Sequence, residues 1–277
     1  MTPLELINPF AAPVFFEETV SSTMNVSREL ASQGFPHGTV IAADYQDEGR
    51  GRTSGRTWEM NKGESLAFTV LLRYAHIGQI PRAMTLRTGL AVSLAIGNFA
   101  PTLTGKIFIK WPNDIMLDTK KVCGILTEAD GKAVHIGIGI NVAQKEFPSH
   151  LSVKATSISL ACGSSLEPQV RFVLLEKILA SLYKEFQSGE NSAANGSNAH
   201  NAAVLDSGSP AWRSRIEERL YKKGEQVTFA PGAAGSGSEI TGILTGIGPD
   251  GELLILPAGA EQPQAFFSGE LLLAGNN

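Results

Sequence analysis

Residues 49–58, GRGRTSGRTW, combine residue types that suit the binding of an anion. Three arginines lie within seven positions, and each guanidinium offers a fork of donors that matches a phosphate or a carboxylate. Gly49, Gly51 and Gly55 permit backbone conformations that other residues avoid and let an anion approach the amides. Because nearby guanidinium groups repel one another, we expect this segment to stay open until an anion binds. A phosphorylated ligand fits this pattern, and an arginine–glycine surface loop with general polyanion affinity is the alternative.

A second polar group lies around the strand-like runs IFIKW and VCGILTE. Alternation directs Lys110 away from the isoleucines of its own strand, and Pro112 ends the pairing after it. Asn113 and Asp114 could cap their own turn, while Asp114 could equally balance the arginines or help to hold Mg²⁺. Lys121 enters the next strand, where the ordinary interpretation is a solvated lysine at a hairpin end.

The run VHIGIGINV at residues 134–142 predicts a strand with two unlike faces. The isoleucines share one face, and Gly137, Gly139 and Asn141 share the other. Glycine inside a strand gives up side-chain packing, so two glycines on one face often mean that another backbone or a flat ligand lies against it. Close packing of a helix on that face is the alternative interpretation.

The composition is that of a globular protein. Of 277 residues, 43% are hydrophobic and 18% charged, and the formal net charge is -4. Anion binding must therefore come from a local cluster of cations, because a general nucleic-acid surface would need a basic chain. The sequence contains neither an apolar run of 18 residues nor a signal-peptide pattern, so we expect a cytoplasmic protein outside the membrane. Cys123 and Cys162 have no metal-ligand spacing and are expected to be buried free thiols.

The elements that must position these residues alternate between strands and helices. TVIAADY and SLAFTVLLR precede the strands already described, and helices are expected over residues 82–99 and 169–186. Residues 188–211 are rich in Ser, Gly, Asn and Ala and indicate a linker. Beyond it, a short helix and the runs EQVTFA, EITGILTGI, GELLILP and AFFSGELLL indicate a small barrel. We therefore expect an α+β domain over residues 1–187 and a second domain over residues 212–277.

A DNA-binding domain is not expected at the start of the chain. A three-helix unit of the helix-turn-helix type needs roughly 50–60 residues before the first core motif, and the sequence has about twenty there. We therefore expect no binding of DNA and no repressor activity.

The motifs taken together resemble those of the biotin protein ligases. The signatures are SST at residues 21–23, YQDEGRGR, GRTW, KWPND, KKVCGI and GIGIN, which occur in that family's order. The resemblance covers about residues 14–273 and implies a mixed central sheet flanked by helices, followed by an SH3-like barrel. It also implies that ATP and biotin form biotinyl-5′-adenylate, with Mg²⁺ accompanying the ATP. The biotinyl group would then pass to a lysine of a biotin carboxyl carrier domain.

The resemblance assigns roles to individual residues, with Arg52 and Lys121 as the catalytic cations. The biotin-binding residues would be Ser22, Thr23, Met24, Gln46, Arg50, Gly51, Arg52, Lys121, Gly124, Gly137 and Gly139. The ATP-binding residues would be Arg52, Arg56, Trp58, Lys110, Asn113, Asp114, Lys121 and Asn141. Two departures from the family pattern are Met24, where many relatives carry Asn, and Thr53 with Ser54, which occupy what is commonly one position. No metal ligands are assigned.

In this mechanism a carboxylate attacks the α-phosphate, so catalysis depends on cation placement and needs no serine or cysteine nucleophile. We expect Lys121→Ala to block formation of the adenylate and Arg52→Ala to release it prematurely. Ligands should protect the loop at residues 49–56 from trypsin. The alternatives are a lipoate or octanoate ligase or transferase of the same fold, an RNA-binding protein, and a biotin sensor without turnover. The chain is expected to be a monomer or a homodimer.

Overall fold

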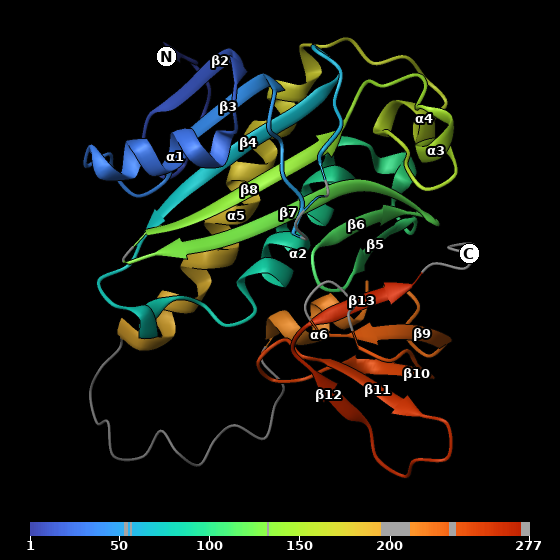
Figure 1. The fold of residues 1–277 in the computed structure, drawn as a ribbon. Helices are drawn as coiled ribbons and strands as arrows, with labels where there is room; N and C mark the ends of the chain where they lie inside the picture. Colours follow the sequence, from blue (N-terminus) through green and yellow to red (C-terminus); the bar gives the residue numbers. More distant parts are fainter. Residues whose placement is uncertain (53–54, 56, 132, 195–210, 233–236, 273–277) are drawn as a thin grey trace.

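The computed structural model of the protein describes residues 1–277 except 53–54, 56, 132, 195–210, 233–236 and 273–277. Two sheets organise the described chain (Figure 1). The strands of the larger sheet are β1 (Thr2–Pro3), β2 (Val14–Val20), β3 (Thr39–Gln46), β4 (Ser65–Arg73), β5 (Ile107–Lys110), β6 (Asp114–Leu117), β7 (Lys120–Asp130) and β8 (Ala133–Asn141). Their order is β1-β2-β3-β4-β8-β7-β6-β5. This sheet is mixed, because β2 and β3 run parallel whereas β4, β8, β7, β6 and β5 pair antiparallel in sequence.

Helices cover both faces of the larger sheet. The described helices are α1 (Thr23–Ser32), α2 (Met84–Phe99), α3 (Ser149–Ser152), α4 (Ile158–Cys162), α5 (Val170–Ala194) and α6 (Ala211–Glu217), with 3-10 turns at Ile77–Gln79 and Pro101–Leu103. Figure 1 shows α1 on one face and α2 and α5 on the other. Gly89 of α2 packs near the isoleucines of β5, β6 and β7, which identifies the apolar face. The opposite face carries α1.

The expected strands and helices of this domain are confirmed. TVIAADY lies in β3, SLAFTVLLR is β4, and the three runs that carry the polar motifs lie in β5, β7 and β8. In the helices, Leu90 of α2 and Leu174, Ile178 and Leu182 of α5 are fully or almost fully buried. The turn after Pro112 is shorter than the sequence indicates, because Asp114 already pairs with Lys110 as the first residue of β6. The α+β class is therefore correct.

The second sheet contains five antiparallel strands. They are β9 (Gln226–Pro231), β10 (Ile240–Ile247), β11 (Leu253–Pro257), β12 (Gln264–Phe266) and β13 (Gly269–Leu272), in the order β12-β11-β10-β9-β13. This arrangement agrees with a small barrel-like domain. The run AFFSGELLL, expected as one strand, is divided between β12 and β13, which pair with β11 and β9 respectively.

The connection between the two sheets differs in part from the expected linker. Helix α5 continues through Ala194, so the first part of the 188–211 segment is helical. Residues 195–210 lie outside the described residues, and α6 begins at Ala211. The parts of the chain that form the two sheets are nevertheless in direct contact. The backbone of Ile109 pairs with Arg219 and Tyr221, and the buried Trp111 side chain donates to the Gly251 carbonyl at 2.9 Å.

Two further expectations concern membrane-spanning helices and the two cysteines. Among the described helices, none is both long and apolar enough to cross a membrane. Cys123 and Cys162 are free thiols, the first fully buried and the second half-buried. Burial raises the pKa of the Cys123 thiol, so it stays protonated at neutral pH.

Candidate functional site

One cavity on the α1 face of the larger sheet gathers most of the residues expected from the motifs. The space inside it, together with the open solvent at its mouth, is about 1050 Å³. All the residues expected to bind biotin line this cavity: Ser22, Thr23, Met24, Gln46, Arg50, Gly51, Arg52, Lys121, Gly124, Gly137 and Gly139. Of those expected only at the nucleotide, the lining residues are Trp58, Lys110, Asn113 and Asp114. Residues from distant parts of the sequence therefore meet at one place.

Glycines of β7 and β8 form the floor of the cavity. A Cβ at Gly139 would lie 2.6 Å from Cε2 of Trp58, so the indole rests directly on the strand. A Cβ at Gly137 would lie 2.9 Å from Sδ of Met24, which comes from α1. The glycine face therefore accommodates a flat ring, as the sequence indicates, and in this structure the ring is the chain's own Trp58.

The inner wall of the cavity is a preorganised set of hydrogen bonds. Ser22 caps α1, because its side-chain oxygen accepts from the Met24 backbone. Gln46 Oε1 accepts from the backbone N–H of Thr23 at 2.8 Å and from its hydroxyl at 3.1 Å. Thr69 donates to the same hydroxyl from β4. These contacts fix the orientation of the Gln46 amide, so the polar groups near a bound ligand need little reordering.

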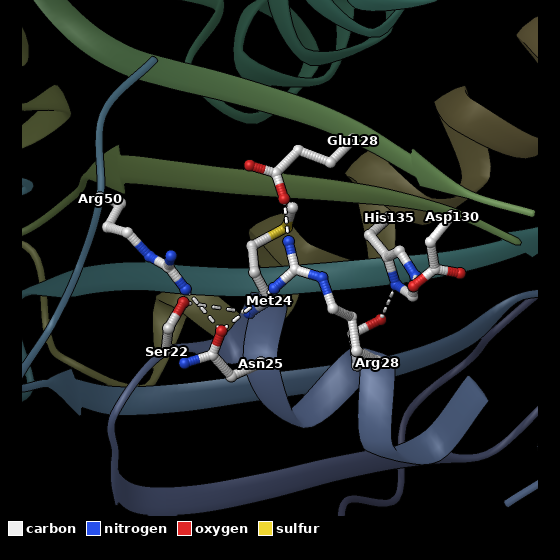
Figure 2. A network of polar contacts seen from close by, with 9 residues as sticks. Ser22, Met24, Asn25, Arg28, Arg50, Glu128, Asp130 and His135 are labelled. Carbon is white, nitrogen blue, oxygen red and sulfur yellow. Dashed lines mark hydrogen bonds and ion pairs between the residues drawn. The ribbon is translucent and has the colours of Figure 1, made fainter. Parts of the chain in front are cut away.

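The two described ends of the arginine–glycine segment, residues 49–52 and 57–58, pair with each other at the cavity like the stem of a hairpin, although the sequence predicts a segment that stays open until an anion binds. The backbone N–H of Trp58 donates to the Gly49 carbonyl at 2.9 Å, and Arg50 pairs with Thr57 in an antiparallel bridge. Two of its arginines reach in different directions. Arg50 donates to Asn25 Oδ1 of α1 (Figure 2), whereas Arg52 donates to the Gly269 carbonyl of β13 at 2.8 Å. Arg56, also expected at the nucleotide, lies outside the described residues.

A lysine–carboxylate pair lies on the wall of the cavity formed by β6 and β7. Lys121 Nζ lies 2.6 Å from Asp114 Oδ1, and the lysine side chain is 35% exposed. The same ammonium is 5.8 Å from the centre of the Trp58 ring, within the range of a cation–π interaction. Asn113 donates to the Ile125 carbonyl at 2.8 Å. The lysine therefore presents its charge to the cavity while Asp114 holds it in place.

Among the described residues expected to bind biotin or ATP, Asn141 is the one that lies away from the cavity. It is buried, donates to the Thr156 carbonyl at 3.0 Å and accepts from Gln144, and it does not line the cavity. Its assignment to the nucleotide stays a prediction.

Other residues line the cavity although the sequence did not assign them to a ligand. They are Thr57, Trp111, Pro112, Ile125, Leu126, Glu128, Ile138 and Glu270. The spacing of Gly124, Leu126 and Glu128 along β7 could have indicated a shared face. No sequence signal places Glu270, because it reaches the cavity from the second sheet.

Ser27 and His135 form an arrangement that resembles part of a catalytic triad. Figure 2 shows His135 beside Asp130. Ser27 Oγ is 2.8 Å from His135 Nδ1, and His135 Nε2 is 3.5 Å from an Asp130 oxygen. Both Ser27 and His135 have no exposed surface, and neither lines the cavity. A nucleophile must reach its substrate, so this pair is a structural contact and not a hydrolytic centre.

Comparison with known proteins gives the family of this arrangement. Residues 16–143 match the biotin/lipoate A/B protein ligase family. The chain is 30% identical over 262 residues to a biotin--[acetyl-CoA-carboxylase] ligase of Paracoccus denitrificans, an alignment that covers 90% of this chain and 98% of that protein. It is 36% identical over 181 residues to the bifunctional ligase/repressor BirA of Bacillus subtilis (strain 168). That alignment covers 63% of this chain, which spans about half (54%) of the length of the repressor.

A solved structure shows the same fold. The biotin protein ligase from Aquifex aeolicus in complex with biotin and ATP is 27% identical to this chain, with a TM-score of 0.71. The match covers 94% of this chain and 97% of that one, so it includes both sheets.

Proposed function

Because the chain belongs to the biotin protein ligase family, we propose that it joins biotin to ATP, forming biotinyl-5′-adenylate and pyrophosphate, and transfers the biotinyl group to a lysine of a carrier protein. The observation that carries the proposal is the single cavity in which the SST, GRGR, KWPND, KKVCGI and GIGIN residues meet. The proposal is also supported by the Paracoccus relative. The alignment with it covers 98% of that protein, which is named for this activity.

The polar inner wall is suited to the ring system of biotin. Gln46 and the Ser22–Thr23 pair offer oriented donors and acceptors, and the glycines of β8 leave space for a flat group. For a ring to lie on Gly139, the Trp58 indole has to leave its present place. Trp58 would then be free to stack on the adenine, the role that the family resemblance implies.

The cations of the cavity are suited to the phosphoryl chemistry. Attack of the biotin carboxylate on the α-phosphate brings two anions together and expels pyrophosphate, so the main task of the protein is to neutralise charge and hold the reactants in line. Lys121 would contact the carboxylate and the phosphate that it attacks, and Arg52 would stabilise the phosphate. In the second step the amine of the acceptor lysine attacks the biotinyl carbonyl, and AMP leaves.

Mg²⁺ would come with the nucleotide in this proposal. Among the described residues no cluster of three or more His, Cys, Asp or Glu side chains could hold a metal ion by itself. Mg²⁺ usually keeps phosphate and water ligands and takes one or two carboxylates from the protein, a demand that Asp114 at the cavity wall fits. The ion would neutralise phosphate charge.

The acceptor would be a biotin carboxyl carrier domain, in keeping with the carboxylase in the name of the Paracoccus relative. The test is incubation of the purified protein with labelled biotin, ATP and such a domain. We expect label on the carrier and one pyrophosphate released per label. A carrier whose target lysine is replaced by arginine is the control for the site of transfer.

Two of the alternatives are distinguished by the same reactants. Labelling by lipoate or octanoate in place of biotin would identify a ligase of different specificity. Binding of biotin without pyrophosphate would identify a sensor. A complete lack of biotin binding would refute the proposal.

A further inference from the structure

Arg50 is held by a residue that none of the motifs includes. Its Nη2 donates to Asn25 Oδ1 at 2.5 Å, and the same oxygen accepts from Arg28 Nη1 at 3.1 Å (Figure 2). The Asn25 amide nitrogen donates to Ser21 Oγ at 3.3 Å. Asn25 is therefore fixed on both sides of its amide, and two guanidinium groups converge on one neutral oxygen.

Further polar contacts support Asn25 from behind. Asn25 and Arg28 lie three residues apart on α1, so their side chains share one face of the helix. Arg28 forms an ion pair with Glu128 of β7, a residue that itself lines the cavity (Figure 2). A continuous set of polar contacts therefore runs from the central sheet through α1 to the arginine–glycine hairpin.

We propose that Asn25 is a positioning residue that holds Arg50, and with it the first strand of the hairpin, at the mouth of the cavity. The inference rests on the proposed function, because Arg50 is one of the residues that the family resemblance assigns to biotin. A bond from a guanidinium to a fixed oxygen selects one rotamer of a long side chain, which lowers the entropy lost when the ligand binds.

The charge balance explains why a neutral side chain is suited to this position. Glu128 neutralises Arg28, and within the described part of the chain Arg50 forms no ion pair. An amide oxygen can therefore direct Arg50 without cancelling the charge that an anionic ligand would need. An aspartate at position 25 would hold Arg50 in the same place but would also compete with the ligand for its charge.

The test compares Asn25→Leu, which keeps the approximate shape but removes the acceptor, with Asn25→Asp, which keeps an oxygen acceptor. The first measurement is the rate of trypsin cleavage after Arg50 and Arg52 without ligand, followed by mass spectrometry. We expect faster cleavage in Asn25→Leu and a rate within about twofold of the original protein in Asn25→Asp. Ser32→Ala, on the same helix but away from the hairpin, is the matched control and should cleave at the original rate.

The second measurement is the Kd for biotin by calorimetry, without ATP. Loss of one such hydrogen bond should raise the Kd of Asn25→Leu roughly 3- to 10-fold. The double variant Asn25→Leu/Arg50→Ala should bind no more weakly than Arg50→Ala alone, because both changes remove the same contact. Independent, multiplying effects would overturn the proposal, as would unchanged cleavage and Kd in Asn25→Leu.

The two measurements separate this inference from the proposed function. If the original protein does not bind biotin, the proposed function fails, yet the cleavage comparison still decides whether Asn25 holds the hairpin. If Asn25→Leu binds biotin and is cleaved as the original protein is, the function stands and the positioning role is wrong.

Discussion

Lys121 is the residue whose charge the proposed chemistry uses most directly. Its only ion pair among the described residues is with Asp114, at 2.6 Å, and the ammonium faces the cavity. Asp114 fixes the position of the lysine before substrate arrives. Its negative charge also lowers the net attraction of the ammonium for an anion. Binding of a negatively charged reactant would therefore have to compete with Asp114 for the ammonium.

We expect Lys121→Ala to slow formation of the adenylate by roughly 10²- to 10³-fold, as loss of a charge-assisted donor does at other oxyanion sites. Pyrophosphate release in the presence of biotin and ATP is the measurement. Lys120→Ala is the control, because the neighbouring lysine donates to the Ser152 carbonyl outside the cavity. A normal rate in Lys121→Ala would remove this residue from the mechanism.

A second prediction for a single residue concerns His135 and the stability of the fold. Burial lowers the pKa of His135 below its ordinary value of 6.5, and nearby Arg28 acts in the same direction against Asp130 and Glu128. The unfolded chain therefore takes up a proton near pH 6.5 that the folded chain does not, so the free energy of unfolding falls as the pH drops below about 6.5. The slope from one histidine is at most about 1.4 kcal/mol per pH unit.

The check is urea unfolding between about pH 7.5 and about pH 5.5, where few carboxylates titrate. His135→Gln has no titrating ring, so its free energy of unfolding should depend less on pH than that of the original protein. Parallel pH profiles would show that other groups dominate.

Strand β8 illustrates how an element determines the shape of the site. Its isoleucines pack into the core, while its glycines face the cavity and allow the Trp58 ring to approach the backbone. Alternate residues of the strand therefore face the core and the cavity. A side chain added on the glycine face would project directly into the cavity.

We expect Gly139→Ala to weaken biotin binding by roughly 10- to 100-fold, because the added Cβ overpacks the floor. The Kd for biotin measures the effect. Gly97→Ala in α2 is the control, since its Cβ would lie an ordinary 3.6 Å from Ile107 and alanine favours the helix. Equal biotin affinity in the two variants would contradict the assigned floor.

Most elements could be predicted from sequence, and the exceptions have physical reasons. The long amphipathic helices and the alternating strands were predicted because apolar residues recur every three to four positions in a helix but every second position in a strand. The break in AFFSGELLL was missed because an apolar run does not reveal that Phe267 lies in the turn, where it is 74% exposed. The motifs identified most of the cavity, whereas Asn25 and Glu270 were missed, because their places depend on contacts between distant segments.

At the scale of the whole molecule, the second sheet completes both the core and the cavity. Trp111 of the first domain packs against Phe229 of β9, with ring centres 5.9 Å apart, and it is 3% exposed. Arg52 and Glu270 bring the two parts together at the cavity itself. A shared buried core favours cooperative unfolding of the two parts.

We therefore expect a single thermal transition in calorimetry. Trp111→Ala should lower the free energy of unfolding by about 3–5 kcal/mol, because it empties a large buried site. Trp111→Phe retains the ring but loses the hydrogen bond to Gly251, and it should cost about 1 kcal/mol. Two separate transitions in the original protein would show that the parts unfold independently.

The position of Trp58 has an optical consequence. Its indole is one of three in the chain, and it lies against bare backbone with a lysine ammonium 5.8 Å from the ring centre. A molecule that takes its place on Gly139 would change the polarity and charge around that ring. The intrinsic fluorescence of the protein should therefore report occupancy of the cavity without any added dye.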